Sequence, residues 1–471
     1  MSDLTDSQAL PLLPHIALFP CAGMGHLTPF LRLASMLSSS QNCLVTLITA
    51  SPAVSAAEST HISLFLSQHP KVNHLEFQLI PSNPTTTTMD DPFFLQWQST
   101  NRSLHLLYPS LASSSPPLSA IFSDFVVASS MGTIAAQLNI PNYIFSPTSC
   151  KFFSLAAYLP TLLSNTSDIS SLTQVNIQGL TPLPMTSIPP PFRNQNHIFT
   201  SLILQNSRAL SSAKGILMNT FHDFESDTLA AINDGRALTN INLPPILPIG
   251  PLQAFELKND QDKYYLSWLD NQPKQSVVYV SFGSRTTMSN SQIRELSKGL
   301  ETSGYRFLWV LKTSKVDKDD IQEVKDMVGE SFLERTKNKG IVLKAWVSQQ
   351  EILEHPAIGG FVNHCGWNSV MEAAQEGIPV LAWPQHSDQS VNAEIVEKAG
   401  LGIWERKWGW GLEGLVSGEE IGNKIVELME NQKVREFSRN VGEKARKASG
   451  IDGKSEKVVM EIMESLMQKR N

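Results

Sequence analysis

The sequence has few cysteines and no long apolar run. Its four cysteines lie far apart and form no CxxC pair: Cys21, Cys43, Cys150 and Cys365. This pattern favours reduced thiols in a cytoplasmic protein over a disulfide framework or a metal site. No apolar stretch reaches the roughly 18 residues of a membrane span, and the first residues, Met-Ser-Asp-Leu-Thr-Asp, carry acid where a signal peptide carries base. We therefore expect no membrane partner and no bound metal.

An excess of positive charge is also missing. The formal net charge is -7, whereas a nucleic-acid partner requires a basic face that releases counterions. One small anion can still be held locally by backbone N–H groups and helix dipoles. Hydrophobic residues make up 41% and charged residues 17% of the 471, which is typical of a globular protein. Because single cores stop growing near about 250 to 300 residues, we expect two domains.

Short apolar segments alternate with helical patterns in two series. The first series of predicted strands comprises 15–21, 44–50, 74–80, 120–125 and 142–146. The second comprises 276–281, 307–311, 340–346, 359–364 and 380–383. Continuous apolarity indicates strands buried on both faces, and hence parallel sheets with helices on each side. The predicted fold class is α/β, with two Rossmann-like doubly wound parallel-sheet domains that face each other across a cleft.

Prolines and polar residues set the predicted domain limits. Residues 243–263 hold several prolines followed by mixed polar residues, which predicts a linker. The predicted domains span 1–242 and 264–452, and a final helix is predicted at 453–471 that can pack back on the first domain.

Two segments, 164–196 and 313–339, are predicted as long loops. The second is a charged run, for which solvated surface is the favoured interpretation. The first is rich in Ser, Thr and Pro, and such a loop either covers the surface or shapes a pocket at the mouth of the sheet.

Polar residues gather where the predicted strand 359–364 gives way to a helix. His364, Asn368 and Ser369 then lie at the carboxyl end of a doubly wound sheet, where such sheets bind ligands. Free N–H groups of the first helical turn, the helix dipole and an imidazole could hold a diphosphate without a metal. Glu372 shares a helix face with Asn368 and could accept two ribose hydroxyls. The alternative is an ordinary helix cap followed by a surface carboxylate.

A glycine turn follows the first predicted strand but lacks the dinucleotide fingerprint. Residues 20–29 contain no third glycine near Thr28, and no acidic residue stands near Ala50. Nicotinamide binding is therefore disfavoured, and the turn instead directs His26 into the cleft. An imidazole removes a phenolic proton best when a carboxylate fixes its tautomer, and Asp124 at the end of the fourth strand is the candidate. The alternative is a structural histidine.

The segment from Trp346 to Gln389 resembles, nearly end to end and in length, the signature box of the plant family 1 UDP-dependent glycosyltransferases. The similarity extends over essentially the whole chain. It implies that the two domains are arranged as in the GT-B type, with an N-terminal acceptor-binding domain at 1–242 and a C-terminal UDP-sugar-binding domain at 264–452. It implies contacts to uridine from Trp346, Val347 and Gln349, and to ribose from Glu372. It implies contacts to the diphosphate from Ser284, His364, Asn368 and Ser369, and to the sugar hydroxyls from Trp367, Asp388 and Gln389. A closing glutamine is associated with glucose in this family.

Two positions depart from the family pattern. Val347 and Ser348 stand where the family usually has Ala or Cys followed by Pro. Because backbone atoms make that contact, we expect little consequence. Arg285 follows Ser284 where many relatives are uncharged, and it could touch a phosphate, the acceptor or solvent.

The resemblance also places His26 and Asp124 at the family's catalytic pair. It implies a single in-line displacement that inverts the α-linked donor to a β-linked product. UDP-glucose is then the co-substrate and UDP the leaving group, without a cofactor or metal, and helix donors stabilise the growing charge on UDP. The family expectation for the oligomeric state is a monomer.

Three features resemble the C-glycosylating subgroup: Asp91-Pro92-Phe93, Ser123 before Asp124, and Gly-Ser-Arg at 283–285. A deprotonated phloroglucinol-type ring carries charge on oxygen and on ring carbons, so one base can serve either bond. We expect C-glucosylation of a flavonoid-type phenol such as a 2-hydroxyflavanone or a dihydrochalcone. O-glucosylation of similar phenols is the alternative, and a non-catalytic UDP-sugar-binding protein is a second one.

The acceptor site is predicted mainly from aromatic side chains near the cleft. The predicted acceptor-binding residues are Gly25, Asp91, Phe93, Phe94, Trp97, Phe125, Phe152 and Phe192. Each aromatic could instead belong to the core, and Asp91 followed by Pro92 could simply begin a helix.

Overall fold

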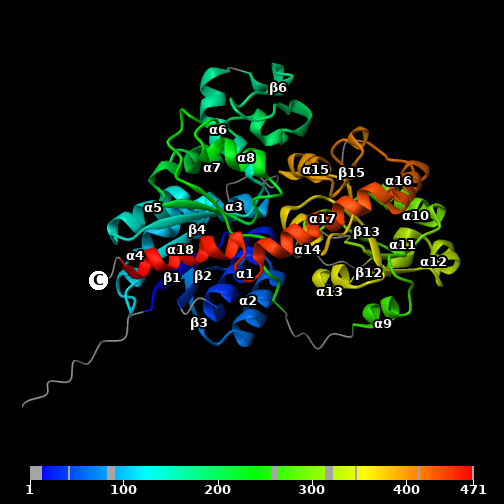
Figure 1. Cartoon of the computed structure of the whole chain (residues 1–471), viewed down its shortest axis with the longest axis horizontal. Helices are drawn as coiled ribbons and strands as arrows, with labels where there is room; N and C mark the ends of the chain where they lie inside the picture. The colour runs from blue at the N-terminus through cyan, green and yellow to red at the C-terminus, as the bar shows by residue number, and fades with distance from the viewer. Residues whose placement is uncertain are drawn as a thin grey trace, which may run out of the picture.

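The computed structural model describes residues 13–40, 43–81, 91–166, 168–255, 263–312, 322–344, 347–411 and 414–468. Two parallel sheets with helices on both faces form two halves that lie side by side (Figure 1). This architecture confirms the predicted fold class. Within the described ranges, no helix is both long and apolar enough to cross a membrane.

The N-terminal sheet has seven parallel strands in the order β3-β2-β1-β4-β5-β8-β9. They are β1 (His15–Phe19), β2 (Leu44–Ser51), β3 (Val72–Gln78), β4 (Ala120–Asp124), β5 (Asn142–Ser146), β8 (Gly215–Met218) and β9 (Ile246–Pro248). The surrounding helices are α1 (Met24–Ser40), α2 (Ala56–Gln68), α3 (Pro92–Ser103), α4 (Tyr108–Ala112), α5 (Ala128–Gln137), α6 (Cys150–Asn165), α7 (Ile198–Ser207) and α8 (Ser226–Asn233). Ala17 and Phe19 pack into one core and Ile16 and Leu18 into another. Burial on both faces explains the continuous apolarity of these strands.

The C-terminal sheet has six parallel strands in the order β12-β11-β10-β13-β14-β15. They are β10 (Val277–Ser281), β11 (Arg306–Val310), β12 (Gly340–Leu343), β13 (Ile358–Asn363), β14 (Val380–Ala382) and β15 (Gly402–Trp404). The helices of this half are α9 (Tyr264–Asp270), α10 (Asn290–Ser303), α11 (Val324–Val328), α12 (Glu330–Thr336), α13 (Gln349–Glu354), α14 (Trp367–Glu376), α15 (Gln389–Lys398), α16 (Gly418–Glu430) and α17 (Gln432–Ser449). Val277 and Tyr279 face one core, and Val278 and Val280 face the other.

Each sheet reverses its strand order at one point. In the first sheet β1 lies beside β4, with Phe19 opposite Ser123. In the second, β10 lies beside β13, with Ser281 opposite Asn363. Loops that leave neighbouring strands at such a point diverge and leave a crevice at the carboxyl ends. The segments that follow β1, β4, β10 and β13 therefore form the site described below.

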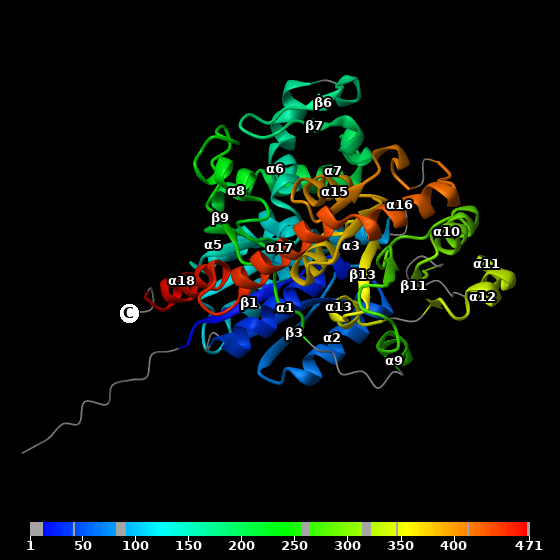
Figure 2. The same cartoon turned by 45° about the vertical axis from the view of Figure 1, so that its right-hand side comes forward.

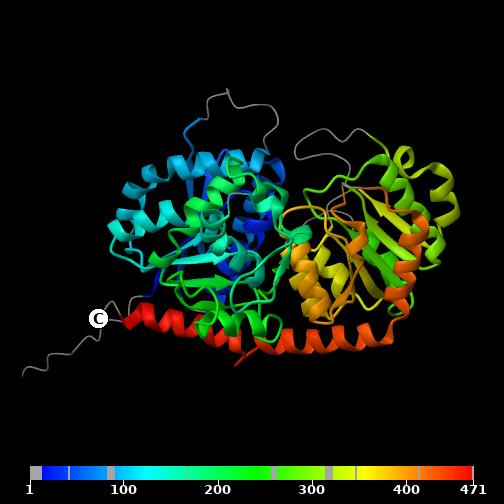
Figure 3. The ribbon, with the colours of Figure 1, turned by 90° about the horizontal axis from the view of Figure 1, so that it is seen from above.

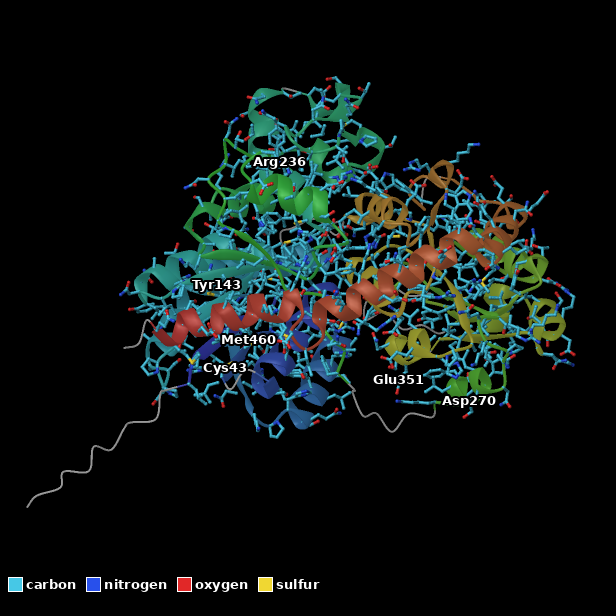
Figure 4. The ribbon with its side chains drawn as sticks, viewed as in Figure 1. Cys43, Tyr143, Arg236, Asp270, Glu351 and Met460 are labelled. Atoms are coloured by element: carbon cyan, nitrogen blue, oxygen red, sulfur yellow. The ribbon has the colours of Figure 1, made fainter. Side chains whose placement is uncertain are left out.

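The last helix, α18 (Lys454–Gln468), packs against the N-terminal half. Figure 2 shows α17 and α18 as a diagonal across both halves, and Figure 3 shows them along one side of the molecule. The apolar residues of α18 that share a core with β1 are Val459, Ile462, Met463 and Leu466. The Ser455 hydroxyl donates to the carbonyl of Gly250 at 2.5 Å. Figure 4 labels Tyr143 beside α18, where its hydroxyl is hydrogen-bonded to Ser465.

Strand β9 corrects the predicted linker 243–263. It pairs with β8, with Ile216 opposite Ile246, and forms the edge of the N-terminal sheet. Pro245 and Pro248 give this segment the composition of a linker. An edge strand tolerates proline because one side of it has no partner strand that needs its N–H groups. The strands β8 and β15 were also absent from the sequence prediction.

Both predicted loops contain regular structure. Segment 164–196 carries an antiparallel pair, β6 (Gln174–Val175) with β7 (Leu183–Pro184), and single turns of 3-10 helix. Its residues in the N-terminal core include Ile169, Val175, Ile177 and Ile188. Segment 313–339, whose first part at 313–321 lies outside the described residues, forms α11 and α12. These helices form because their apolar residues pack into the core of the second sheet, namely Met327, Val328 and Phe332.

Candidate active site

His26 lies in the first turn of α1, directly after the glycine turn. Gly23 has φ 110°, which glycine adopts far more easily than other residues, and its carbonyl accepts the His26 N–H at 2.9 Å. Nδ1 of His26 lies 2.7 Å from Oδ2 of Asp124 at the end of β4. Asp124 is fully buried, and its Oδ1 accepts the N–H of Val126 at 3.1 Å. Because the carboxylate accepts the proton on Nδ1, Nε2 is left as the basic nitrogen.

Two further side chains fix the turn that carries His26. Oε1 of Glu58 accepts the N–H of Gly23 at 2.7 Å. Nε1 of Trp97 donates to the carbonyl of Ala22 at 2.8 Å, and its ring meets His26 edge-on with the ring centroids 4.8 Å apart. The sequence analysis did not find Glu58, because no local pattern connects α2 with the turn.

A cavity enclosing about 1010 Å³, partly open to solvent, lies between the two halves. Its lining includes predicted residues from both halves: Gly25, His26, Trp97, Phe125, Phe152, Ser284, His364, Asp388 and Gln389. The apolar wall also contains residues that the sequence analysis did not name: Val126, Phe153, Ala156, Phe199 and Ile203. The candidate base, the candidate phosphate site and an apolar chamber therefore share one space.

Three predicted acceptor residues lie behind this wall rather than in it. Phe192 is fully buried and stacks on Phe199, with ring centroids 5.3 Å apart. Phe94 stacks on the other side of Phe199 at 5.0 Å. Phe93 is buried under the guanidinium of Arg285, 4.2 Å from its ring centroid. These aromatics support the wall, and the prediction of direct acceptor contact is corrected for them.

Arg285 lines the cavity and joins the two halves. Its Nη2 lies 2.5 Å from Oδ2 of Asp91, while Oδ1 of Asp91 accepts the N–H of Phe93 at 2.9 Å. Asp91 thus caps α3, with Pro92 in the first turn, and also holds an arginine of the other half. Asp91 is not among the residues that line the cavity, so it acts on the cavity through Arg285.

The candidate diphosphate site lies at the beginning of α14. The helix has Gly366 as its N-cap without a side-chain cap bond, so the alternative that Asn368 and Ser369 form an ordinary cap is wrong. Uncapped N–H groups at a helix N-terminus bind anions. His364 is enclosed by two glycines, since a Cβ at Gly283 or at Gly366 would come within 2.5 Å of its Nε2. Burial, with a smaller effect from nearby His386, lowers the pKa of His364 to about 3.

The predicted nucleoside residues form a connected group on α13 and α14. Nε2 of Gln349 donates to Oγ of Ser369 at 2.8 Å and to Oε2 of Glu372 at 2.6 Å. The other carboxylate oxygen of Glu372 pairs with Arg32 of α1. Asn368 donates through Nδ2 to the carbonyl of Gly25 at 3.1 Å.

Two tryptophans of the box, Trp346 and Trp367, are predicted to contact the donor. Trp346 lies outside the described residues. Trp367 is buried, donates through Nε1 to the carbonyl of Asn219 at 2.8 Å and contacts Phe224. Its side chain is therefore not positioned to contact sugar hydroxyls, which corrects the prediction. Val347 is buried in the adjoining core.

Asp388 and Gln389, which are predicted to contact the sugar, both line the cavity. Oδ2 of Asp388 accepts from Thr148 Oγ1 at 2.5 Å and from Asn392 Nδ2 at 2.9 Å, and burial raises the pKa of Asp388. Oε1 of Gln389 accepts the N–H groups of Gln385 at 2.8 Å and His386 at 2.9 Å. The amide nitrogen Nε2 of Gln389 lies 3.4 Å from Nδ1 of His386, which leaves its second N–H available to a ligand hydroxyl.

The polar residues of this lining that the sequence analysis did not identify include Thr148 and His386. Thr148 follows β5, so its position at the carboxyl edge of the first sheet could have been recognised. His386 lies beside Asp388 within the box itself. Its imidazole pKa is lowered to about 4 by burial and by Arg285.

Two doubly wound sheets whose reversal points face one cavity define a GT-B-type transferase that binds a sugar nucleotide. The family model for UDP-glucoronosyl and UDP-glucosyl transferase matches residues 126–407. The chain is 48% identical over 472 residues to UDP-glycosyltransferase 708C1 of Fagopyrum esculentum, covering 99% of each protein. It is 43% identical to UDP-glycosyltransferase CGT of Oryza sativa subsp. japonica, covering 95% of each.

A solved structure, LpCGTa in complex with UDP, has a TM-score of 0.84 and 42% identity, covering 97% of this chain and 99% of that one. The chain belongs to the plant family 1 UDP-glycosyltransferases and resembles their C-glucosyltransferase subgroup, as its sequence predicted. It is a glycosyltransferase enzyme.

Proposed function

We propose that this enzyme transfers glucose from UDP-glucose to a ring carbon of a flavonoid-type phenol, with inversion. One observation carries the proposal: His26, held by the buried Asp124, lines the same cavity as His364 and Asp388. A base from one half and a phosphate-binding helix end from the other can therefore act on two substrates together. The solved structure of the related LpCGTa is a complex with UDP, which supports a UDP-linked sugar as the donor proposed here.

The reaction follows from this arrangement. Nε2 of His26 removes a phenolic proton, and the carboxylate of Asp124 stabilises the imidazolium. A ring carbon of the phenolate attacks the anomeric carbon opposite to UDP, so a C–C bond forms as the C–O bond to UDP breaks. The N–H groups at the beginning of α14 stabilise the charge on the departing diphosphate. Loss of the proton from the attacked ring carbon restores the aromatic ring.

Arg285 supports transfer to carbon. Its guanidinium lines the cavity and is held by Asp91 and Phe93. A fixed cation in the chamber can bind a second phenolate or carbonyl oxygen of the acceptor and so present a ring carbon to the donor. The apolar chamber of Phe125, Phe152 and Phe199 suits the second ring of a dihydrochalcone or 2-hydroxyflavanone.

The proposed reaction takes place in a site formed by a single chain. Every residue of the site comes from that chain, so the proposal requires no second subunit and is in keeping with a monomer. The four cysteines are buried and free, which suits a reducing compartment such as the cytoplasm.

The test is to incubate the protein with UDP-glucose and a dihydrochalcone, and to treat the product with hot acid. A C-linked sugar stays on the phenol, and NMR shows a carbon–carbon bond to the anomeric position. Release of free glucose would instead establish O-glucosylation, the alternative that the same base supports. UDP binding without any product would identify a binding protein, which the His26–Asp124 contact argues against.

A further inference from the structure

Two helices meet between the halves: α1, which carries His26, and α14, which begins at the candidate diphosphate site. They contact each other at two levels. Asn368 donates to the carbonyl of Gly25 at 3.1 Å, and one turn along α14 Glu372 pairs with Arg32. Positions seven apart on α1 and four apart on α14 each share a helix face. The two contacts therefore form one row along the interface.

The Arg32–Glu372 pair is closed off from solvent. The two side chains are 7% and 8% exposed. The second oxygen of Glu372 accepts from Gln349, which also binds Ser369. Each oxygen of the carboxylate thus already has a partner. A buried charge without a partner is strongly unfavourable. The carboxylate of Glu372 can therefore separate from Arg32 only when another hydrogen-bond donor takes the place of the guanidinium.

The cavity ends before this pair. Its lining includes His364 and Gly366, directly ahead of α14. Among the described residues, its lining does not include Gln349 or Glu372. The space for acceptor and sugar is open, whereas the carboxylate expected to bind ribose is covered by an arginine of the opposite half.

We propose that Arg32 is a positioning residue that holds Glu372 in the empty enzyme and yields it to the ribose when the nucleotide binds. This inference rests on the proposed function, in which Glu372 accepts the ribose hydroxyls. The ribose diol supplies two donors to the carboxylate, and α1 moves away from α14 as Arg32 becomes hydrated. Nucleotide binding then competes with a contact between the two halves.

The test compares UDP binding, by isothermal titration calorimetry, in four proteins: the wild type, Arg32→Met, Arg32→Lys and Glu394→Gln. Arg32→Met removes the competing cation, so its Kd for UDP should fall about fivefold or more. Arg32→Lys keeps the cation and should bind UDP like the wild type. Glu394→Gln is the matched control, because it breaks another ion pair between the halves, Lys151–Glu394 at 2.9 Å, without touching Glu372. Its Kd should not change.

A second readout separates positioning from loss of structure. With UDP-glucose saturating, kcat of Arg32→Met should stay near the wild-type value, because the contact with Glu372 is already released when the nucleotide is bound, while KM for UDP-glucose falls. Circular dichroism and thermal melting establish that each variant is folded. A folded Arg32→Met protein whose affinity for UDP is unchanged or weaker overturns the inference, and so does equal tightening in Glu394→Gln. A wild type that binds no UDP would contradict the proposed function itself.

Discussion

His26 and Asp124 are 98 positions apart in the sequence, yet Nδ1 of the imidazole lies 2.7 Å from a carboxylate oxygen that has no solvent exposure. The two residues follow adjacent strands, β1 and β4, at the point where the strand order reverses. The fold itself therefore creates this contact, and no long loop is needed to reach across.

Replacing His26 by Ala should lower kcat about 10²- to 10⁴-fold, the usual contribution of a general base. UDP should bind with unchanged affinity, because His26 does not belong to the helix end that holds the diphosphate. Asp124→Asn should cause a smaller loss, since the imidazole remains but its charged form is less stabilised. Steady-state kinetics and calorimetry measure both quantities. Wild-type turnover in His26→Ala would show that another group is the base.

Asp91→Asn separates the two roles of Asp91. Asparagine is as good an N-cap as aspartate, so α3 should keep its start, whereas the ion pair with Arg285 is lost. The released guanidinium should raise KM for the acceptor roughly tenfold, in line with a charged hydrogen bond, and leave the Kd for UDP unchanged.

Lys398→Met provides the control for Asp91→Asn. Lys398 pairs with Asp227 of the other half at 2.7 Å, at an exposed position away from the cavity. Exposed pairs contribute little, so the kinetic constants should stay at wild-type values. An equal rise in acceptor KM for both variants would show that the effect comes from the contact between the halves and not from Arg285.

Binding of UDP-glucose should take up protons. The pKa of His364 is lowered to about 3 in the empty protein, mainly by burial. A bound diphosphate favours the charged imidazole and raises this pKa. A ligand that raises a pKa binds more tightly as pH falls, so affinity should increase from pH 7 to pH 5. Calorimetry in two buffers of different ionisation enthalpy measures the uptake, which should disappear in His364→Gln. Equal heats in both buffers would contradict this assignment.

Glu225 should make stability fall with rising pH. It accepts the N–H groups of Cys150 and Lys151 at 3.1 and 3.2 Å, and burial raises its pKa from 4.5 to about 7. A raised folded-state pKa stabilises the fold fully below pH 4.5, and this contribution is lost as pH rises through about 7. The difference corresponds to about 3 kcal/mol.

The measurement for Glu225 is urea unfolding of the wild type and Glu225→Gln at pH 5, 6 and 7. The buried histidines, whose pKa values are lowered, act in the opposite direction in both proteins and cancel in the difference. The wild type should lose stability relative to Glu225→Gln over this range. Parallel curves would show that Glu225 is charged throughout.

The parts of the fold that the sequence predicted are those with a local pattern. Continuous apolar strands and the turns after them predicted the strand ends at which His26, Asp124 and His364 lie. The pair Arg32–Glu372 could not be predicted, because its members are 340 positions apart and each is an ordinary polar residue on a helix. Phe152 and Phe192 show the same limit: both are aromatic and near the cleft, but only packing decides which one faces it.

Strand β9 and helices α11 and α12 were missed for a different reason. Each is short, and the residues that surround it in the sequence are common in loops. Strand β9 forms because it pairs with β8. Helices α11 and α12 form because a few of their apolar residues are buried in the core of the second sheet. Tertiary contacts therefore decided their structure over local propensity.

The path of α18 determines where fluorescent labels must be placed to measure a movement of the two halves relative to each other. Helix α18 shares a core with α2 and β1 of the N-terminal half, and Figure 3 shows it beside that half. Fluorescent labels on α2 and α18 would therefore both follow the N-terminal half and would not report a change in its distance from the other half. One dye on α18, which packs on the N-terminal half, and another on α16 of the C-terminal half would report the distance between the two halves.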